Sequence, residues 1–202
     1  MKKACIFPVA VSLLMLSSNS RAAVDVSVFY GLRGGGEVEE TETGEIHRID
    51  DSTSSGVVIE YDLNDSQQIE FLYSHQESAL LAGGSFTGVK VFDLDVDYYH
   101  IGGTYAPGSE RWRPFVAMTV GLTRLTPRDA RYEDTNRFSF AIAGGVKGRL
   151  VNHIAWHVEA RGYNTVLESG TSIFCADGEC TFSVSGNGYW QYELHAGLGV
   201  SF

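Results

Sequence analysis

Several histidines lie beside serines and acids, the residue types that carry out nucleophilic acyl transfer. That chemistry needs a serine, a histidine within hydrogen-bond reach and a third group that orients the histidine. Ser74 and His75 are neighbours in the chain, so a strand would direct them to opposite faces. His157 and Glu159 share a face, but no serine lies near them on it. Local spacing therefore assembles no triad, and we expect no enzymatic activity.

Three aspartates at alternate positions, Asp93, Asp95 and Asp97, could suggest a calcium site. Calcium sites, however, draw their ligands from bent loops rather than from one straight strand. We therefore expect these carboxylates to pair with arginines or to be hydrated. The sequence predicts no metal and no cofactor.

The N-terminus has the pattern of a secretory signal peptide. Lys2 and Lys3 precede an apolar run from Ile6 to Leu16, and Ser20-Arg21-Ala22 offers the small residues that a signal peptidase needs. We assign residues 1–22 to a cleaved signal and residues 23–202 to one domain, which suits the length of the chain.

Two cysteines, Cys175 and Cys180, remain after this processing. An even pair in an exported protein predicts a disulfide, here one that closes a short loop. Removal of the signal also leaves 12 of the 15 basic side chains against 25 acidic ones, a formal charge near −13. This balance disfavours a nucleic-acid partner, which would need a basic surface.

Alternation of apolar and polar residues with a period of two recurs eight times along the mature chain. In the last segment one face carries only apolar side chains from Trp190 to Phe202, while the other carries Gln191, Glu193 and His195. A strand sorts residues in this way and a helix does not. The eight expected strands lie near residues 24–33, 57–63, 68–74, 92–98, 112–122, 138–147, 154–161 and 190–202. In the fourth segment the pattern loses phase near Tyr99 to Gly103, where we expect a bulge.

The connections between these segments alternate between long and short. Long ones are expected at residues 34–55, 76–91, 125–136 and 168–188, and short ones near residues 64–66, 107–109 and 151–152. Long outer loops and short periplasmic turns are typical of outer-membrane barrels. No window of the mature chain is apolar enough for a membrane helix. The prediction is an all-β fold, a transmembrane antiparallel up-and-down barrel of eight strands.

The direction of the apolar face decides between a membrane barrel and a soluble one. A soluble, lipocalin-like barrel would turn the same stripe inward around a ligand. Here the polar face is rich in Gly, Ala and Ser, and Lys90 and Lys147 are the only lysines of the mature chain. Aromatic residues near the strand ends also suit a lipid-facing barrel, namely Tyr30, Tyr61, Tyr73, Trp112, Phe138, Trp190 and Tyr192. We therefore expect the apolar face to meet lipid.

The polar face would then line a lumen just wide enough for side chains to fill. Its charged members are Glu60, Glu70, Asp93, Asp95, Asp97, Arg113, Lys147, His157, Glu159, Arg161, Glu193 and His195. Buried charges are costly unless paired, so we expect a network of ion pairs that plugs the barrel. In it Arg161 should pair with Glu193 or Glu159. The alternative is a polar pathway for small solutes.

The last strand resembles the terminal strand of bacterial outer-membrane proteins, which end in phenylalanine after apolar residues at alternate positions. The residues that carry this resemblance are Tyr192, Leu194, Leu198, Val200 and Phe202. The whole mature chain resembles the small OmpA/OmpX/OmpW-like outer-membrane barrels. The resemblance implies recognition of the last strand by the barrel assembly machinery, with periplasmic chaperones on the way. It also implies a monomer in contact with outer-membrane lipid and lipopolysaccharide.

The relatives implied by this resemblance have several functions, including structural anchors, adhesion-related proteins and narrow pores. We expect a non-enzymatic outer-membrane protein with a structural or surface-interaction role and four extracellular loops. One alternative is a narrow channel for small solutes or small apolar molecules. Another is a lipid A-modifying enzyme, since some small barrels carry a Ser/His/acid triad on the outer face.

Overall fold

The computed structural model describes residues 24–40, 46–82, 88–108, 111–129, 132–151, 153–167, 171–176, 179–185 and 188–202. For residues 38–40, 171–176 and 179–185 it describes the backbone alone. Twelve β-strands account for most of these residues. No helix among them is long and apolar enough to cross a membrane. The expected signal peptide at residues 1–22 lies outside the described residues and stays a prediction.

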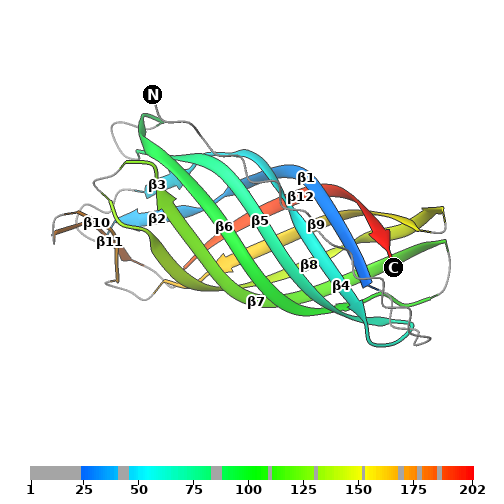
Figure 1. Cartoon of the computed structure of the whole chain (residues 1–202). Helices are drawn as coiled ribbons and strands as arrows, with labels where there is room; N and C mark the ends of the chain where they lie inside the picture. Colours follow the sequence, from blue (N-terminus) through cyan, green and yellow to red (C-terminus); the bar gives the residue numbers. More distant parts are fainter. Residues whose placement is uncertain are drawn as a thin grey trace, which may run out of the picture.

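Eight long, tilted strands form a closed barrel (Figure 1). Each pairs antiparallel with the next of the eight along the chain, and the last pairs with the first, as in Leu32 opposite Leu194. The expected all-β, eight-stranded, up-and-down barrel is therefore confirmed. The barrel strands are β1 (Val24–Gly35), β4 (Ser52–Asp62), β5 (Gln67–Leu81), β6 (Lys90–Tyr105), β7 (Trp112–Pro127), β8 (Thr135–Val151), β9 (Ile154–Thr165) and β12 (Tyr189–Ser201).

The two ends of the barrel differ. At one end, here the short-turn end, brief turns join β4 to β5, β6 to β7 and β8 to β9, and both Val24 and Phe202 lie there. The β4–β5 turn is fixed by Asn64, whose Oδ1 accepts hydrogen bonds from the backbone N–H groups of Ser66 and Gln67, each 3.0 Å long. The opposite end, here the long-loop end, carries the longer connections.

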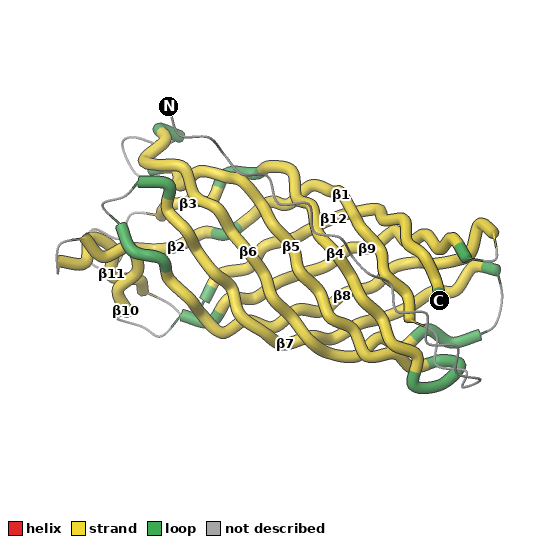
Figure 2. Tube along the Cα trace, viewed as in Figure 1, coloured by secondary structure: helices red, strands yellow, loops and turns green. Residues whose placement is uncertain are grey.

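Four further strands extend the sheet at the long-loop end, which lies on the left in Figure 2. They are β2 (Glu37–Glu40), β3 (Ile46–Ile49), β10 (Thr171–Ala176) and β11 (Glu179–Ser185). β3 pairs with β5, where Ile49 is opposite Leu80, and β2 pairs with β11. Two of the expected long loops thus contain strands. The other two are shorter than expected, because β5 runs on to Leu81 and β7 to Pro127.

An apolar belt surrounds the outside of the barrel. Large hydrophobic side chains on it remain solvent-exposed, among them Val28, Leu32, Met118, Leu194 and Leu198 at 57–67 %. Soluble proteins do not leave so much contiguous apolar surface open to water. A continuous outer belt of this kind is the surface expected of a barrel in lipid.

The structure contradicts the predicted orientation of β6. Phe92, Leu94, Val96 and Tyr98 point inward and are 0–5 % exposed, whereas the three alternating aspartates lie on the outer face. Asp97, for example, bonds to the outward side chains of Tyr73 and His75. The apolar face was assigned to lipid, but this half of β6 lies towards the long-loop end. There the apolar face packs into the barrel interior instead.

The predicted bulge near Tyr99 to Gly103 is also wrong. Tyr99 and Ile101 continue the outer face that begins with the aspartates, and His100 continues the inner one. β6 keeps an unbroken register with β7 through this stretch. The apparent loss of phase in the sequence marks the point where the outer face changes from polar to apolar residues.

The predicted disulfide between Cys175 and Cys180 falls on residues whose side chains lie outside the description. The backbone places the two residues opposite one another in the β10–β11 ladder. We predict that replacing both with serine removes about 2 kcal/mol or less of stabilisation, as expected for a short closed loop. The double variant should still run as a folded barrel on an unboiled detergent gel. Failure to insert would show that this hairpin is needed for assembly.

Candidate functional site: the barrel lumen

The inward positions of the eight strands fill the lumen with polar side chains over much of its length. From the short-turn end inward there is a cavity, then a series of ion pairs, then an aromatic and apolar core. The core includes Phe92, Leu94, Val96, Leu125 and Leu167, all 5 % exposed or less. The ion pairs hold most of the charged residues that the sequence assigned to the lumen.

Arg161 on β9 is the centre of the first group of charges. Its Nη2 donates to Glu70 Oε1 over 2.6 Å, and its Nε donates to Glu159 Oε1 over 2.5 Å. Glu70 Oε2 accepts a further hydrogen bond from Thr104, 2.7 Å long. The three charged side chains are 0–4 % exposed. Each charge therefore has a hydrogen-bonded partner, which is the condition for burying it.

Arg33 on β1 is the centre of the second group. Its Nε donates to Glu193 Oε2 over 2.8 Å, and its Nη2 also contacts Ser74. Glu193 Oε1 accepts a hydrogen bond from His195 Nδ1, 2.8 Å long. Both side chains of the Arg33–Glu193 pair are fully buried.

Aromatic rings hold the guanidinium of Arg33 in place. It lies 4.8 Å from the ring centre of Tyr98 and 5.1 Å from that of Tyr163, a cation–π arrangement. The two tyrosine rings stack at 4.0 Å. Tyr98 also donates to Gln191 Oε1 over 2.8 Å. This layer separates the charged groups from the apolar core.

A third group lies closer to the short-turn end. Lys147 on β8 donates to Glu60 Oε1 on β4 over 2.7 Å, across the barrel, and also bonds to Gln68. Its ammonium lies 5.2 Å from the ring centre of Phe115. Lys147 and Glu60 are 9 % and 12 % exposed, more open than the deeper pairs.

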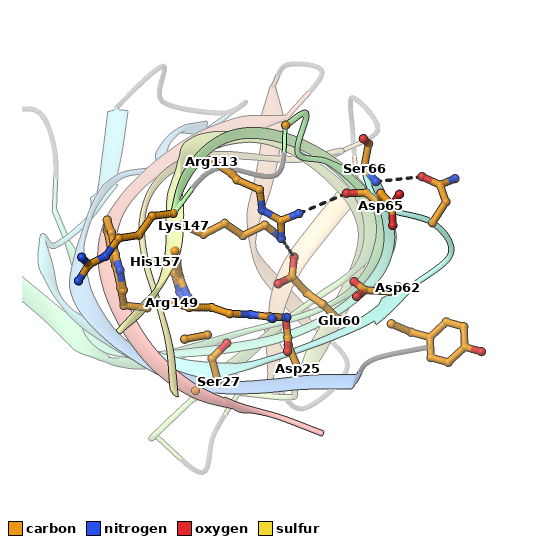
Figure 3. A pocket seen from close by; sticks show the side chains of 18 of the residues that line it. Asp25, Ser27, Glu60, Asp62, Asp65, Ser66, Arg113, Lys147, Arg149 and His157 are labelled. Carbon is orange, nitrogen blue, oxygen red and sulfur yellow. Dashed lines mark hydrogen bonds and ion pairs between the residues drawn. The ribbon is translucent and has the colours of Figure 1, made fainter. Parts of the chain in front are cut away.

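Beyond Lys147 the lumen widens into a cavity of about 1000 Å³ at the short-turn end, here the vestibule. Figure 3 looks into it, and the Lys147–Glu60 pair crosses the opening. Arg113 lies on its wall and donates to the backbone oxygen of Asp65 over 3.2 Å. Buried polar atoms without a hydrogen-bond partner in the described structure include Asp25 Oδ1 and His157 Nε2. Both residues line the vestibule, so water can satisfy them.

The structure thus brings together most of the predicted lumen residues, in three groups. The first two meet at His195, whose Nε2 lies 3.8 Å from Glu159 Oε1. Glu70, Glu159 and Arg161 form one, Glu193 and His195 belong to the second, and Glu60 and Lys147 form the third. Arg113 and His157 lie apart from the buried ion pairs, on the vestibule wall. Arg161 pairs with one of its two expected partners, Glu159, and not with Glu193.

Glu193 is instead bound by Arg33, which was not among the predicted lumen charges. The signal was present, because Arg33 has the same parity as Asp25 and Ser27 on the polar face of the first strand. It was missed because it is the last residue of that segment and borders an expected loop.

Comparison with known proteins gives the fold. No family model and no curated protein matches the sequence. Among solved structures, the outer membrane protein OprG from Pseudomonas aeruginosa aligns over 90 % of this chain and 96 % of its own, with a TM-score of 0.63 at 13 % identity. The outer membrane protein AlkL aligns over 100 % and 97 %, with a TM-score of 0.61 at 15 % identity. Neisserial surface protein A aligns over 91 % and 98 %, with a TM-score of 0.57 at 13 % identity. The chain has the fold of small outer-membrane β-barrels.

The buried pairs generate a stability prediction. Arg161→Ala leaves Glu70 and Glu159 buried without their cation, so the free energy of unfolding should fall by about 3–5 kcal/mol. Arg113→Ala, at the vestibule wall, removes one bond to a backbone oxygen and should cost less than about 1 kcal/mol. Both are measured by urea unfolding in lipid vesicles. Equal stabilities for the two variants would mean that water reaches the Arg161 group.

Proposed function

We propose that this chain is an integral protein of the bacterial outer membrane, with a lumen that is closed to solutes. Its function then depends on surfaces outside the lumen, in a structural or surface-interaction role. The closed ladder of backbone hydrogen bonds and the outer apolar belt support a place in lipid. The likeness in fold to solved outer-membrane proteins agrees with this.

The observation that carries the proposal is the pair of buried charge groups around Arg161 and Arg33. Both guanidinium groups are fully buried. Arg161 on β9 reaches across the lumen to Glu70 on β5, whereas Arg33 on β1 is held by Glu193 on the neighbouring strand β12. A solute crossing at this level would have to separate Arg161 from Glu70, the pair that spans the lumen. Separating such a pair exposes two uncompensated charges, at a cost of several kcal/mol each. The lumen therefore supports the barrel rather than conducting through it.

The long-loop end offers the surface through which such a protein would act, and we place it outside the cell. The outer wall there carries charges in hydrogen-bonded pairs. Arg128 bonds to both Asp95 and Glu77 at 2.9 Å, and Arg124 to Asp134 at 2.5 Å. The hydrogen bonds to Asp95 and Glu77 raise the pKa of Arg128. Lipopolysaccharide, which carries phosphates, is the neighbour that such a wall would meet.

The last strand supports the proposed route of assembly. Tyr192, Leu194, Leu198 and Val200 share the outer face of β12, and Phe202 is 62 % exposed next to its end. These side chains are open to a partner during insertion. We propose that the barrel assembly machinery recognises them after delivery by periplasmic chaperones, and that the inserted protein is a monomer.

Transport is the second candidate, and the vestibule favours it. A cavity of about 1000 Å³ reaches from the short-turn end to the Lys147–Glu60 pair. Beyond the ion pairs, the lumen at the long-loop end is lined by apolar side chains such as Leu94 and Val96. A route for small apolar molecules would have to open between these two regions, where Arg161 and Arg33 now block it.

Conductance decides between the two candidates. In planar bilayers the parent protein should show no steady conductance, because paired side chains occlude its lumen. The double variant Arg33→Ala, Arg161→Ala should show transient openings, whereas the vestibule variant Arg113→Ala should resemble the parent. Steady conductance of the parent, with only ion selectivity changed in the double variant, would replace this proposal with transport.

A further inference from the structure

A row of polar side chains lies on the outside of the barrel, next to the apolar belt on the side of the long-loop end. On four successive strands, β4 to β7, the directly opposed outward residues are Ser55, His75, Asp97 and Arg124. The next outward row towards the short-turn end is Val57, Tyr73, Tyr99 and Leu122, also in direct register. On these four strands the polar row lies where the apolar surface ends, which fits a position near lipid headgroups and ester groups. On the neighbouring strand β1 the exposed Tyr30 and Leu32 continue the apolar surface.

Asp97 holds the imidazole of His75 in a defined orientation. Asp97 Oδ1 accepts a hydrogen bond from His75 Nδ1, 2.8 Å long, and another from the hydroxyl of Tyr73, 2.9 Å long. The ring of Tyr73 packs 5.1 Å from that of Tyr99, which anchors the hydroxyl. With Nδ1–H committed to the carboxylate, Nε2 carries the free lone pair. This is the tautomer that a general base needs.

Ser55 faces His75 from the neighbouring strand. Directly opposed residues have Cβ atoms about 4.5–5.5 Å apart, so rotation of the Ser55 side chain alone can turn its Oγ towards the imidazole that Asp97 holds. The Ser55 hydroxyl makes no hydrogen bond within the described part of the chain. Glu77 Oε1 lies 4.0 Å from Nε2 but is itself bound by Arg128 at 2.9 Å. Nε2 is therefore available to the serine.

Exposure increases along the row in the order that hydrolysis requires. The side chain of Asp97 is 14 % exposed and that of His75 31 % exposed, while Ser55 is an exposed residue. The orienting acid is thus the most shielded from water and the nucleophile the most accessible. Arg124, one strand further, is 46 % exposed and is paired with Asp134 at 2.5 Å.

We propose that Ser55, His75 and Asp97 form a hydrolytic site that cleaves an acyl ester of a phosphorylated lipid in the adjacent membrane leaflet. Ser55 and His75 are the catalytic residues, and Asp97 is a positioning residue that acts through His75. The site opens sideways into lipid, so its substrate is a lipid and not a soluble ester. Arg124 binds the phosphate in place of Asp134, since a guanidinium matches phosphate oxygens in a bidentate manner.

The reaction requires only water as co-reactant. Ser55 Oγ attacks the ester carbonyl carbon as its proton passes to His75 Nε2, and the carbon–oxygen bond to the lipid alcohol breaks as His75 returns the proton to the leaving oxygen. Water then attacks the acyl-serine, giving its proton to His75, and the fatty acid leaves as Ser55 recovers its proton. No electron transfer is involved.

This inference goes beyond the proposed function and revises the expectation that the chain has no enzymatic activity. That expectation considered neighbours in the sequence, whereas Ser55, His75 and Asp97 are about twenty residues apart and meet through strand register. The site lies on the outer wall. If the hydrolytic site proved inactive, the proposal of a closed lumen would still stand. If the parent protein conducted steadily, the proposal of this site would still stand.

The first test uses the purified full-length barrel in mixed micelles with an alkyl fluorophosphonate, which labels activated serines. The parent should be labelled, and Ser55→Ala should lose both labelling and fatty-acid release, by at least about 100-fold. The matched control is Thr53→Ala, which removes the next outward hydroxyl on β4 and should change neither. Gel migration without boiling shows that each variant is folded. An unlabelled parent, or labelling that persists in Ser55→Ala, overturns the proposal.

The second test separates the roles and the lipid source. Asp97→Asn should lower kcat at least about 100-fold with KM unchanged, while Asp95→Asn, the next outward acid on β6, should have no effect. Arg124→Gln should raise KM about tenfold for a phosphorylated lipid but not for diacylglycerol. Diacyl phosphatidylglycerol and purified lipid A are compared as substrates, and either one supports the proposal. Release from neither, or equal loss in Asp95→Asn, overturns it.

Discussion

The closed ladder of antiparallel hydrogen bonds is the constraint on which the rest of the structure depends. In lipid, each backbone N–H and C=O must find a partner within the protein, and pairing of β12 with β1 removes the last free edge. Closure also fixes the inward and outward face of each residue. With eight strands the interior is narrow enough for side chains to fill it, so whatever points inward must pack and pair with what faces it.

The lumen charges follow from that requirement. Arg33 and Arg161 approach from different strands, and each is surrounded by carboxylates, hydroxyls or aromatic rings that compensate its burial. Phe29 illustrates how closely the interior is packed, because it stacks on His195 at 4.1 Å and lies over Gly56. A side chain at Gly56 would place its Cβ 2.5 Å from the Phe29 ring. The vestibule, by contrast, is an open space of about 1000 Å³.

Alternation in the sequence predicted the eight strands because face and period are local properties. It failed for the first half of β6, where Leu94 and Val96 are apolar and yet point inward. The period of the alternation does not show where the membrane-facing part of a strand ends. Beyond that point the apolar side chains point into the barrel instead of outward. Arg33 was lost at a segment boundary, and the pairing of Arg161 with Glu70 depends on contacts across the barrel. The row from Ser55 to Asp97 could not be predicted, because it depends on the register of three strands. The loops that join those strands were expected to be longer than they are, and Ser55 was placed in one of them.

The apolar core inside the long-loop end shows that the same eight strands have two surroundings. One part of each strand faces lipid and the other part faces water. Towards the short-turn end, outward residues such as Leu122 are apolar and suit lipid. Towards the long-loop end of the same strand, here the upper part, the outward Arg124 suits water and the inward Leu125 is buried. The upper part is organised like a small soluble barrel, and the hydrophobic effect in water stabilises it. Its unfolding therefore carries the positive heat-capacity change of a water-soluble protein, whereas the belt, if it only exchanges lipid contacts, adds little. One continuous β-ladder thus joins two halves with different temperature dependence, and the upper half alone is subject to weakening of the hydrophobic effect in the cold.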